Sequence, residues 1–171
     1  ENVPNAQIAL VTFYGGNNAG DEDTEVCLRR NSRNQCIEYS ENDATLVRGF
    51  GKTETSDSNS NLDNVTIPGP NNGWDGGTNI EAGLKLAKAE LDKIKDDVFK
   101  YVVLIGDGSP TFYYDTDGST TGTGQGHDDD AEDAALDIAT EIKKNEKIYS
   151  IGYEVPRNSE AENTLKAIAT P

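Results

Sequence analysis

The sequence contains no methionine, one histidine and one tryptophan, and its basic residues number fewer than half of its acidic ones. The 15 Lys and Arg residues against 31 Asp and Glu residues give a formal charge of −16. Proteins that bind nucleic acids or anionic membrane surfaces present basic side chains to phosphate, so this balance argues against both partners. The same balance is compatible with divalent cations and with solubility outside a cell.

Long apolar runs are also missing, because no stretch approaches the roughly 18 residues that indicate a membrane span. The sequence has neither an initiator methionine nor a signal peptide, and we therefore expect a mature or trimmed product. His127 is the only histidine, and no serine stands in the pattern of a nucleophile elbow. Without an acid–base pair we do not expect an enzyme. The length of 171 residues suits one domain, which we place at 1–171.

Two cysteines, Cys27 and Cys36, lie close together in a polar stretch. A local disulfide between them predicts an oxidising compartment, while the alternative is two free thiols. A zinc site is not expected, because two thiols and one distant histidine do not supply its ligands.

The clearest strand is Tyr101 to Ile105, five apolar residues in a row that predict a strand buried on both faces. Asp107 follows it between two glycines, at the edge where open α/β sheets bind ligands. Asp107 could also be a simple turn residue, because aspartate is common in turns.

Helix-spaced and strand-like segments alternate along the rest of the chain. We expect inserted surface loops at about 15–44 and 109–127. The strands are expected at 7–14, 44–50, 101–105 and 147–155, and the helices at 80–91, 128–145 and 158–169. This order predicts an α/β protein with a mostly parallel sheet, one antiparallel edge strand and helices on both faces.

The motifs Gly76-Gly77-Thr78-Asn79 and Leu104-Ile105-Gly106-Asp107-Gly108 resemble those of the von Willebrand factor A domain family. The strand IALVTF comes before them and the strand IYSIGYEV after them, in the order that the family shows. The resemblance implies a doubly wound, Rossmann-like sheet. It also implies truncation at both ends, so that the domain is partial.

In that family a Mg²⁺ or Mn²⁺ ion sits at the top of the sheet, in the metal-ion-dependent adhesion site (MIDAS). The resemblance assigns Thr78 and Asp107 as metal ligands, with a partner carboxylate completing the shell. The family's Asp-x-Ser-x-Ser motif is absent from residues 1–171, so the site is incomplete here. The chain would therefore lack the family's first, central strand, and strands 8–14 and 101–105 would flank an empty slot.

Aromatic residues near this edge are candidate ligand contacts. Trp74 precedes the Gly-Gly-Thr motif, although a single tryptophan more often packs inside the protein. Phe112, Tyr113 and Tyr114 follow Asp107, and they could contact a ligand or cover the end of the sheet. The acidic residues 115, 117 and 128–130 could bind Ca²⁺, but a solvated loop and a charged helix start are the commoner arrangement.

The resemblance implies an extracellular adhesion module of a cell wall or pilus, similar to the tip adhesins of Gram-positive pili. Its partners would be a host or matrix protein that presents a carboxylate, and other pilus or surface-protein segments. The rival hypothesis is a structural domain of a surface protein without metal-dependent binding.

Overall fold

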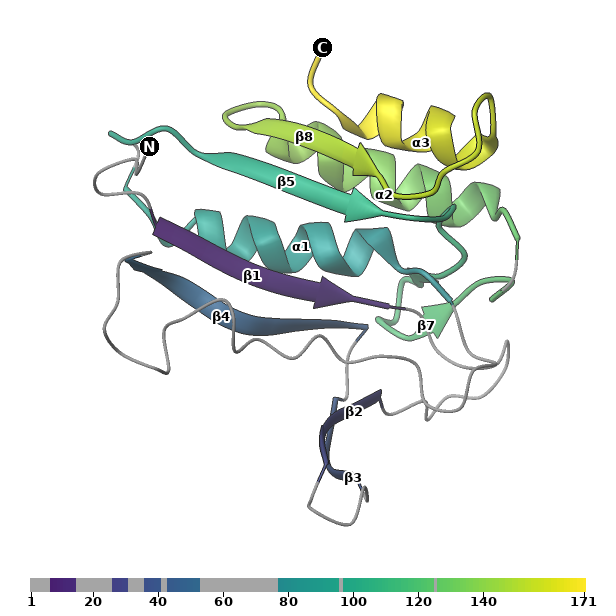
Figure 1. Ribbon diagram of the computed structural model, residues 1–171, viewed down its shortest axis with the longest axis horizontal. Helices are drawn as coiled ribbons and strands as arrows, with labels where there is room; N and C mark the ends of the chain where they lie inside the picture. The colour runs from purple at the N-terminus through teal and green to yellow at the C-terminus, as the bar shows by residue number, and fades with distance from the viewer. Residues whose placement is uncertain are drawn as a thin grey trace.

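The computed structural model describes residues 7–14, 26–30, 36–40, 43–52, 77–95, 97–124 and 126–171. For 26–30, 36–40 and 51–52 it describes the backbone alone. Figure 1 shows the main strands in one layer, with helices α1 and α2 behind them. The protein is thus a mixed α/β structure, as the alternating sequence pattern predicts.

Strands β1 (Gln7–Phe13) and β4 (Ala44–Lys52) form an antiparallel pair, with Phe13 opposite Ala44 and Gln7 opposite Lys52. Two register shifts interrupt the pairing between Ile8 and Val11. The predicted antiparallel pairing of these two strands is confirmed, but among the described residues the pair is a sheet of its own and not the edge of a mostly parallel sheet.

Strands β5 (Tyr101–Gly106) and β8 (Lys147–Gly152) pair in parallel without a register shift. Val103 lies opposite Tyr149, and Gly106 lies opposite Gly152. Both strands fall where the sequence predicts them, although β8 ends three residues earlier than the expected boundary at Val155. The backbone turns away after Gly152, and Glu154 adopts a positive φ of 54°.

The three helices begin at side chains that cap them. Helix α1 (Ile80–Leu91) begins after Asn79, α2 (Asp129–Ile142) after Asp128, and α3 (Glu160–Ile168) after Ser159. Each capping oxygen accepts a hydrogen bond from the backbone N–H three residues on, which satisfies one free donor of the first turn.

Two short hairpins lie within the predicted inserted loops. Strands β2 (Val26–Arg30) and β3 (Cys36–Ser40) form the first, and β6 (Tyr113–Tyr114) and β7 (Thr120–Thr121) form the second. The two cysteines thus lie on the paired strands of one hairpin. Their side chains are outside the described residues, so the disulfide stays a prediction.

One hydrophobic core joins the helices to the strands. Helices α1, α2 and α3 bury one stripe each against the same side of β5 and β8, and Phe13 and Phe50 pack onto the edge of this cluster. The fully buried members of the core are Ile80, Leu84, Ala135, Ala139, Ile142, Ile148 and Ile168.

The expectation that helices cover both faces of the sheet is wrong for the described residues. Along β5 burial alternates, so that Val102 and Leu104 are buried while Val103 and Ile105 are 57% and 60% exposed. The prediction that β5 is buried on both faces is therefore also wrong. The described helices pack on a single side, and no described segment covers the other.

The two strand pairs do not join into one sheet. Among the described residues β1 pairs with β4 alone and β5 with β8 alone. Figure 1 shows β1 and β5 running in the same direction, with α1 behind the interval between them. Among the described residues, β1 and β5 thus do not pair with each other, and the expected empty slot between them stays a prediction.

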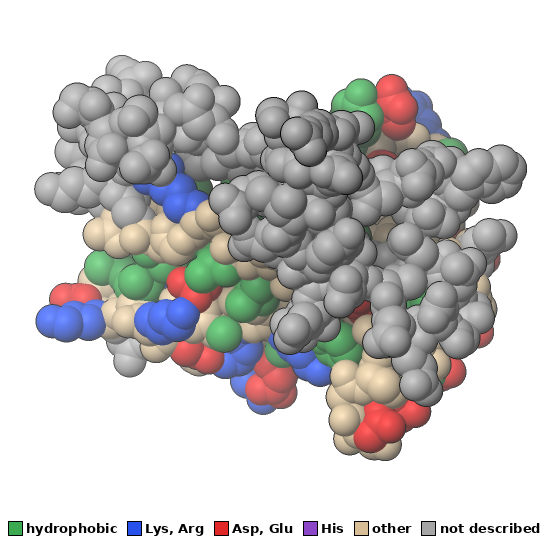
Figure 2. Space-filling model, turned by 90° about the horizontal axis from the view of Figure 1, so that it is seen from below, with side chains coloured by type: hydrophobic (Ala, Val, Ile, Leu, Met, Phe, Trp, Pro, Cys, Tyr) green, Lys and Arg blue, Asp and Glu red, His purple; other side chains and the backbone are tan. Residues whose placement is uncertain are grey.

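In the part of the chain that the structure describes, no helix is long and apolar enough to cross a membrane. Figure 2 shows one face of the molecule, where hydrophobic side chains lie among basic and acidic ones.

Helix α1 approaches β1 closely at Gly83. A methyl group there would lie 2.8 Å from the ring of Phe13, closer than real contacts allow. We expect Gly83→Ala to lower the free energy of unfolding, because overpacking costs about 1–3 kcal/mol while the gain in helix propensity is about 1 kcal/mol.

Urea denaturation measures this change, and Phe13→Ala provides the matched background. In that background Gly83→Ala should no longer destabilise the protein. A Gly83→Ala variant of unchanged or higher stability in the wild-type background would contradict the close approach.

Candidate functional site

The carboxyl end of the strands carries most of the polar side chains that the sequence singles out. Strands β1 and β5 end at Phe13 and Gly106. Because β4 runs antiparallel to β1, its first residue lies at the same edge, and Asp43 directly precedes it. Asp43, the segment 77–79 and Asp107 therefore belong to one edge.

Asn79 forms hydrogen bonds to three different segments at this edge. It is fully buried, its Oδ1 accepts from the N–H of Ala82 at 2.9 Å, and its Nδ2 donates to Asp43 Oδ2 at 2.7 Å. Its own N–H donates to the carbonyl of Tyr14, just beyond β1, at 3.2 Å. One side chain and one amide thus join α1 to the ends of β1 and β4.

Thr78 is held by its backbone. Its N–H donates to Thr111 Oγ1 at 2.8 Å, and its carbonyl accepts from the N–H groups of Thr111 and Phe112 at 2.9 and 3.2 Å. The sequence left open whether Thr78 or Asn79 caps the helix, and the cap is Asn79. Among the described residues, no hydrogen-bond partner engages the Thr78 hydroxyl.

Asp107 lies directly after β5, as predicted, and its side chain is exposed. The loop that follows it returns to Thr78 through the two hydrogen bonds from Thr111 and Phe112. The structure therefore joins the two predicted ligands through one loop, although no direct contact between them is present.

The aromatic candidates differ in position. Phe112 is 3% exposed, so in this structure it covers the end of the sheet, which is the second of the two alternatives for it. Tyr113 and Tyr114 are half-buried on β6. Trp74 lies outside the described residues.

Glu81, in the first turn of α1, holds the aromatic hairpin in place. Its carboxylate accepts from the N–H of Tyr114 at 2.7 Å and forms an ion pair with Lys85. The Lys85 ammonium lies 5.2 Å from the centre of the Tyr114 ring. Burial, and then the negative charge of Asp43, raise the pKa of Tyr114 to about 12, so this phenol is neutral at physiological pH.

Asp43 is the member of this edge that the sequence analysis missed. It is 6% exposed, and Asp43 Oδ2 accepts from Asn79 Nδ2 and from Thr120 Oγ1, the latter at 2.8 Å. Burial raises its pKa above the ordinary value, while these two hydrogen bonds oppose the shift. Its position next to an antiparallel strand was the available signal, because such a strand begins where its neighbour ends.

The acidic loop residues have structural partners. Asp117 accepts from the N–H and the hydroxyl of Ser119, and these hydrogen bonds lower its pKa. Asp128 accepts from the N–H groups of Thr123 and Ala131, which fixes the start of α2. These contacts favour the turn and helix-start interpretation over a Ca²⁺ site.

The donor set at this edge fits part of a hard-cation site. Asp107 and Thr78 supply a carboxylate and a hydroxyl oxygen, which are ligand types that Mg²⁺ and Mn²⁺ accept. Within the described ranges, no group of three or more His, Cys, Asp or Glu side chains could hold a metal ion. Further oxygen ligands would come from a partner, from water or from residues outside the described ranges.

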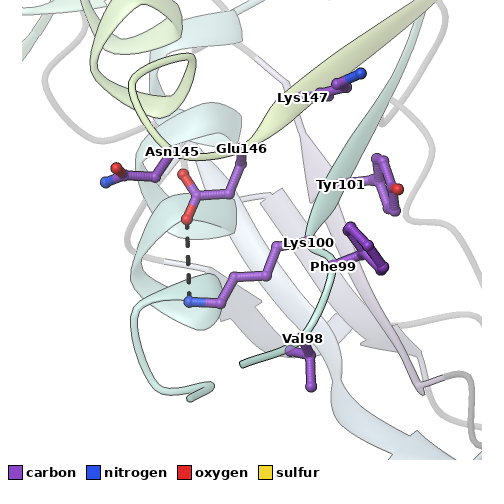
Figure 3. A pocket seen from close by; sticks show the side chains of 7 residues that line it. All are labelled: Val98, Phe99, Lys100, Tyr101, Asn145, Glu146 and Lys147. Atoms are coloured by element: carbon purple, nitrogen blue, oxygen red, sulfur yellow. Dashed lines mark ion pairs between the residues drawn. The ribbon is translucent and has the colours of Figure 1, made fainter. Parts of the chain in front are cut away.

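A pocket of about 490 Å³ lies at the opposite edge, at the amino ends of β5 and β8. Figure 3 shows Phe99 and Tyr101 on one side of it, and Lys100 and Glu146 pointing toward each other. The Lys100 and Glu146 side chains, each 9% exposed, form an ion pair at 4.0 Å. The pocket is therefore separate from the edge that carries Asp107.

A scan against models of known protein families finds no match, and a search of curated proteins finds none either.

The buried hydrogen bond between Asp43 and Asn79 should contribute to the free energy of unfolding. Asp43→Ala removes the acceptor and leaves the buried Asn79 amide unpaired, so the free energy of unfolding should fall by about 1–3 kcal/mol. Asp43→Asn keeps one oxygen that can accept from both Asn79 and Thr120, and it should be much less harmful. Urea denaturation at neutral pH would compare the two, and equal losses would contradict the assigned role of the oxygen.

Because the pKa of Asp43 is raised in the folded protein, the free energy of unfolding should depend on pH. The folded protein holds this proton more tightly than the unfolded chain does, so the contribution of Asp43 to stability is full below its ordinary pKa of 3.8. That contribution is lost as the pH rises through the folded pKa. Relative to the wild type, Asp43→Asn should therefore become more stable as the pH rises above about 4. Parallel stability profiles in a series of urea titrations would contradict the shift.

Proposed function

We propose that this protein is an adhesion module of the von Willebrand factor A type, which captures a partner carboxylate through a divalent cation. The cation, Mg²⁺ or Mn²⁺, would be held by Asp107 and Thr78 at the carboxyl edge of the strands. It would supply a positive charge with an open coordination position, which a carboxylate oxygen can occupy.

One observation carries the proposal. Asn79 caps α1, so the hydroxyl of Thr78 is not engaged as the cap, and the loop after Asp107 is hydrogen-bonded to the backbone of Thr78. Two oxygen donors from separate elements are thereby held at one edge of the fold. The exposure of Asp107 leaves its carboxylate accessible to a cation.

The fold class supports the proposal at a coarser level. The protein is of the mixed α/β class, with a parallel pair β5–β8 and an antiparallel pair β1–β4, and the doubly wound sheet of that family belongs to the same class. Ligand sites at the carboxyl edge are the rule in such sheets.

The cellular setting is part of the same proposal. A charge of −16 and a pair of cysteines that could form a local disulfide suit an extracellular protein of a cell wall or pilus. The partner would be a host or matrix protein, with the hairpins β2–β3 and β6–β7 setting specificity around the cation.

A structural domain without metal-dependent binding is the second candidate. The observation that favours it is that Asp117 and Asp128 serve as turn and helix caps, which assigns much of the acidic surface near this edge to folding.

Titration calorimetry with Mn²⁺ separates the two functions. The protein should bind Mn²⁺. Asp107→Ala should abolish the heat of binding, because Asp107 is the charged member of the two proposed ligands, Asp107 and Thr78. Thr78→Ala should weaken binding, while Thr78→Ser, which keeps the hydroxyl oxygen, should bind nearly as well as the wild type.

Asp117→Ala is the matched control, because it removes an exposed carboxylate from the same loop region. It should leave Mn²⁺ binding unchanged. Equal binding by Asp107→Ala and the wild type, or adhesion that survives chelation of divalent cations, would favour the structural domain.

A further inference from the structure

Strands β5 and β8 present an exposed apolar face on the side away from the helices. Their register places Val103 beside Tyr149, and directly paired residues point to the same side of a sheet. The ring centres of Tyr101 and Tyr149 lie 5.9 Å apart, and Figure 3 shows Phe99 on the same side of the chain as Tyr101. The β5–β8 face consists of Phe99, Tyr101, Val103, Ile105, Tyr149, Ile151 and Tyr153.

This face is larger than the apolar patch that a monomeric protein usually exposes. Between 49% and 92% of the surface of each of its residues is exposed. Since a large side chain carries about 150–250 Å² of surface, the whole face amounts to roughly 800–900 Å². The largest apolar patch of a typical monomer covers about 300–600 Å², and a stable complex buries about 800 Å² on each partner. The β5–β8 face is therefore large enough for a complete protein interface.

The charge of the chain narrows the choice of partner. The formal charge of −16 opposes contact between two copies wherever their surfaces are acidic. Alternate positions from 99 to 105 and from 147 to 153 make up this side of the strands, and they contain Lys147 and no acidic residue. Two copies can therefore meet through the β5–β8 face without bringing carboxylates together, whereas a basic partner would find its complement on the acidic surfaces.

The two ends of the face differ in shape in a way that suits a two-fold pair. At the amino end lies the pocket that Phe99 and Lys147 help to line, and at the carboxyl end Tyr153 is 63% exposed. Asn145, which also lines the pocket, comes four residues before Tyr149, and Tyr153 comes four residues after it. A two-fold axis that crosses the strands at Tyr149 therefore brings each Tyr153 to the pocket of the other copy.

We propose that the protein forms a homodimer in which the β5–β8 faces of two copies pack against each other with their strands antiparallel. The two sheets lie about 10 Å apart, which is the usual spacing of packed sheets. Both members of the interface belong to residues 1–171. Asp107 follows β5 and is not part of the face, so this dimer does not depend on metal binding there.

Sedimentation equilibrium of the 171-residue protein tests the proposal, in a buffer that contains EDTA so that association through a metal ion is excluded. The expected dissociation constant of the dimer is micromolar or tighter, because interfaces of this size range from micromolar to picomolar. Val103→Glu should raise that constant by at least about 100-fold, since it places two unpaired like charges in the centre of the interface.

Ile8→Glu is the matched control for Val103→Glu. It changes the net charge by the same amount and also replaces an exposed apolar strand residue, but Ile8 lies on β1, outside the face. This variant should dimerise as the wild type does.

Tyr153→Ala tests the contact with the pocket without altering β8, which ends at Gly152. The exposed side chain contributes little to the fold of one copy, so the circular dichroism spectrum should stay unchanged while the dissociation constant rises by at least about tenfold. Tyr153→Phe keeps the ring and should dimerise nearly as well as the wild type.

Three results would overturn the proposal. A wild-type protein that stays monomeric up to about 0.1 mM would leave the face to a different partner. A dimer that both Val103→Glu and Tyr153→Ala leave unchanged would show that the copies meet elsewhere. A dimer that Val103→Glu weakens but Tyr153→Ala does not would overturn the antiparallel arrangement.

Discussion

The hydrogen bond between Asn79 and Asp43 is the contact on which the carboxyl edge depends. Asn79 is fully buried, and a buried amide without a partner would cost the fold more than the bond itself contributes. The same residue caps α1 and binds the carbonyl of Tyr14, while Asp43 also accepts from Thr120. Helix α1, the ends of β1 and β4, and the hairpin β6–β7 are therefore positioned by one buried pair.

The position of α1 then determines which residues reach the edge. Asn79 caps α1, and the backbone carbonyl of the preceding Thr78 binds the loop after β5. Asp107 stands at the start of that loop and remains exposed. The proposed cation site thus depends on the same buried pair that stabilises the fold, without including either of its members.

The described helices cover one side of strands β5 and β8 and leave the other side exposed. All three helices share one core, and this leaves Val103, Ile105, Tyr149 and Ile151 exposed on the other side. Parallel strands are usually covered on both faces, because each face carries apolar side chains. Among the described residues, this face of β5 and β8 is therefore apolar and exposed.

The sequence by itself determined the helices and the strands β1, β4, β5 and β8, but not the two hairpins β2–β3 and β6–β7 within the expected loops. Apolar runs and helix spacing predicted the bounds of α1 and placed β5 and β8 within a few residues, because these signals are local. They also placed Asp107 at a strand end. Local patterns did not reveal the helices' common side, the burial of Phe112, or Asp43 as the partner of Asn79. Only the tertiary structure decided these, because each depends on contacts between segments that lie far apart in the chain.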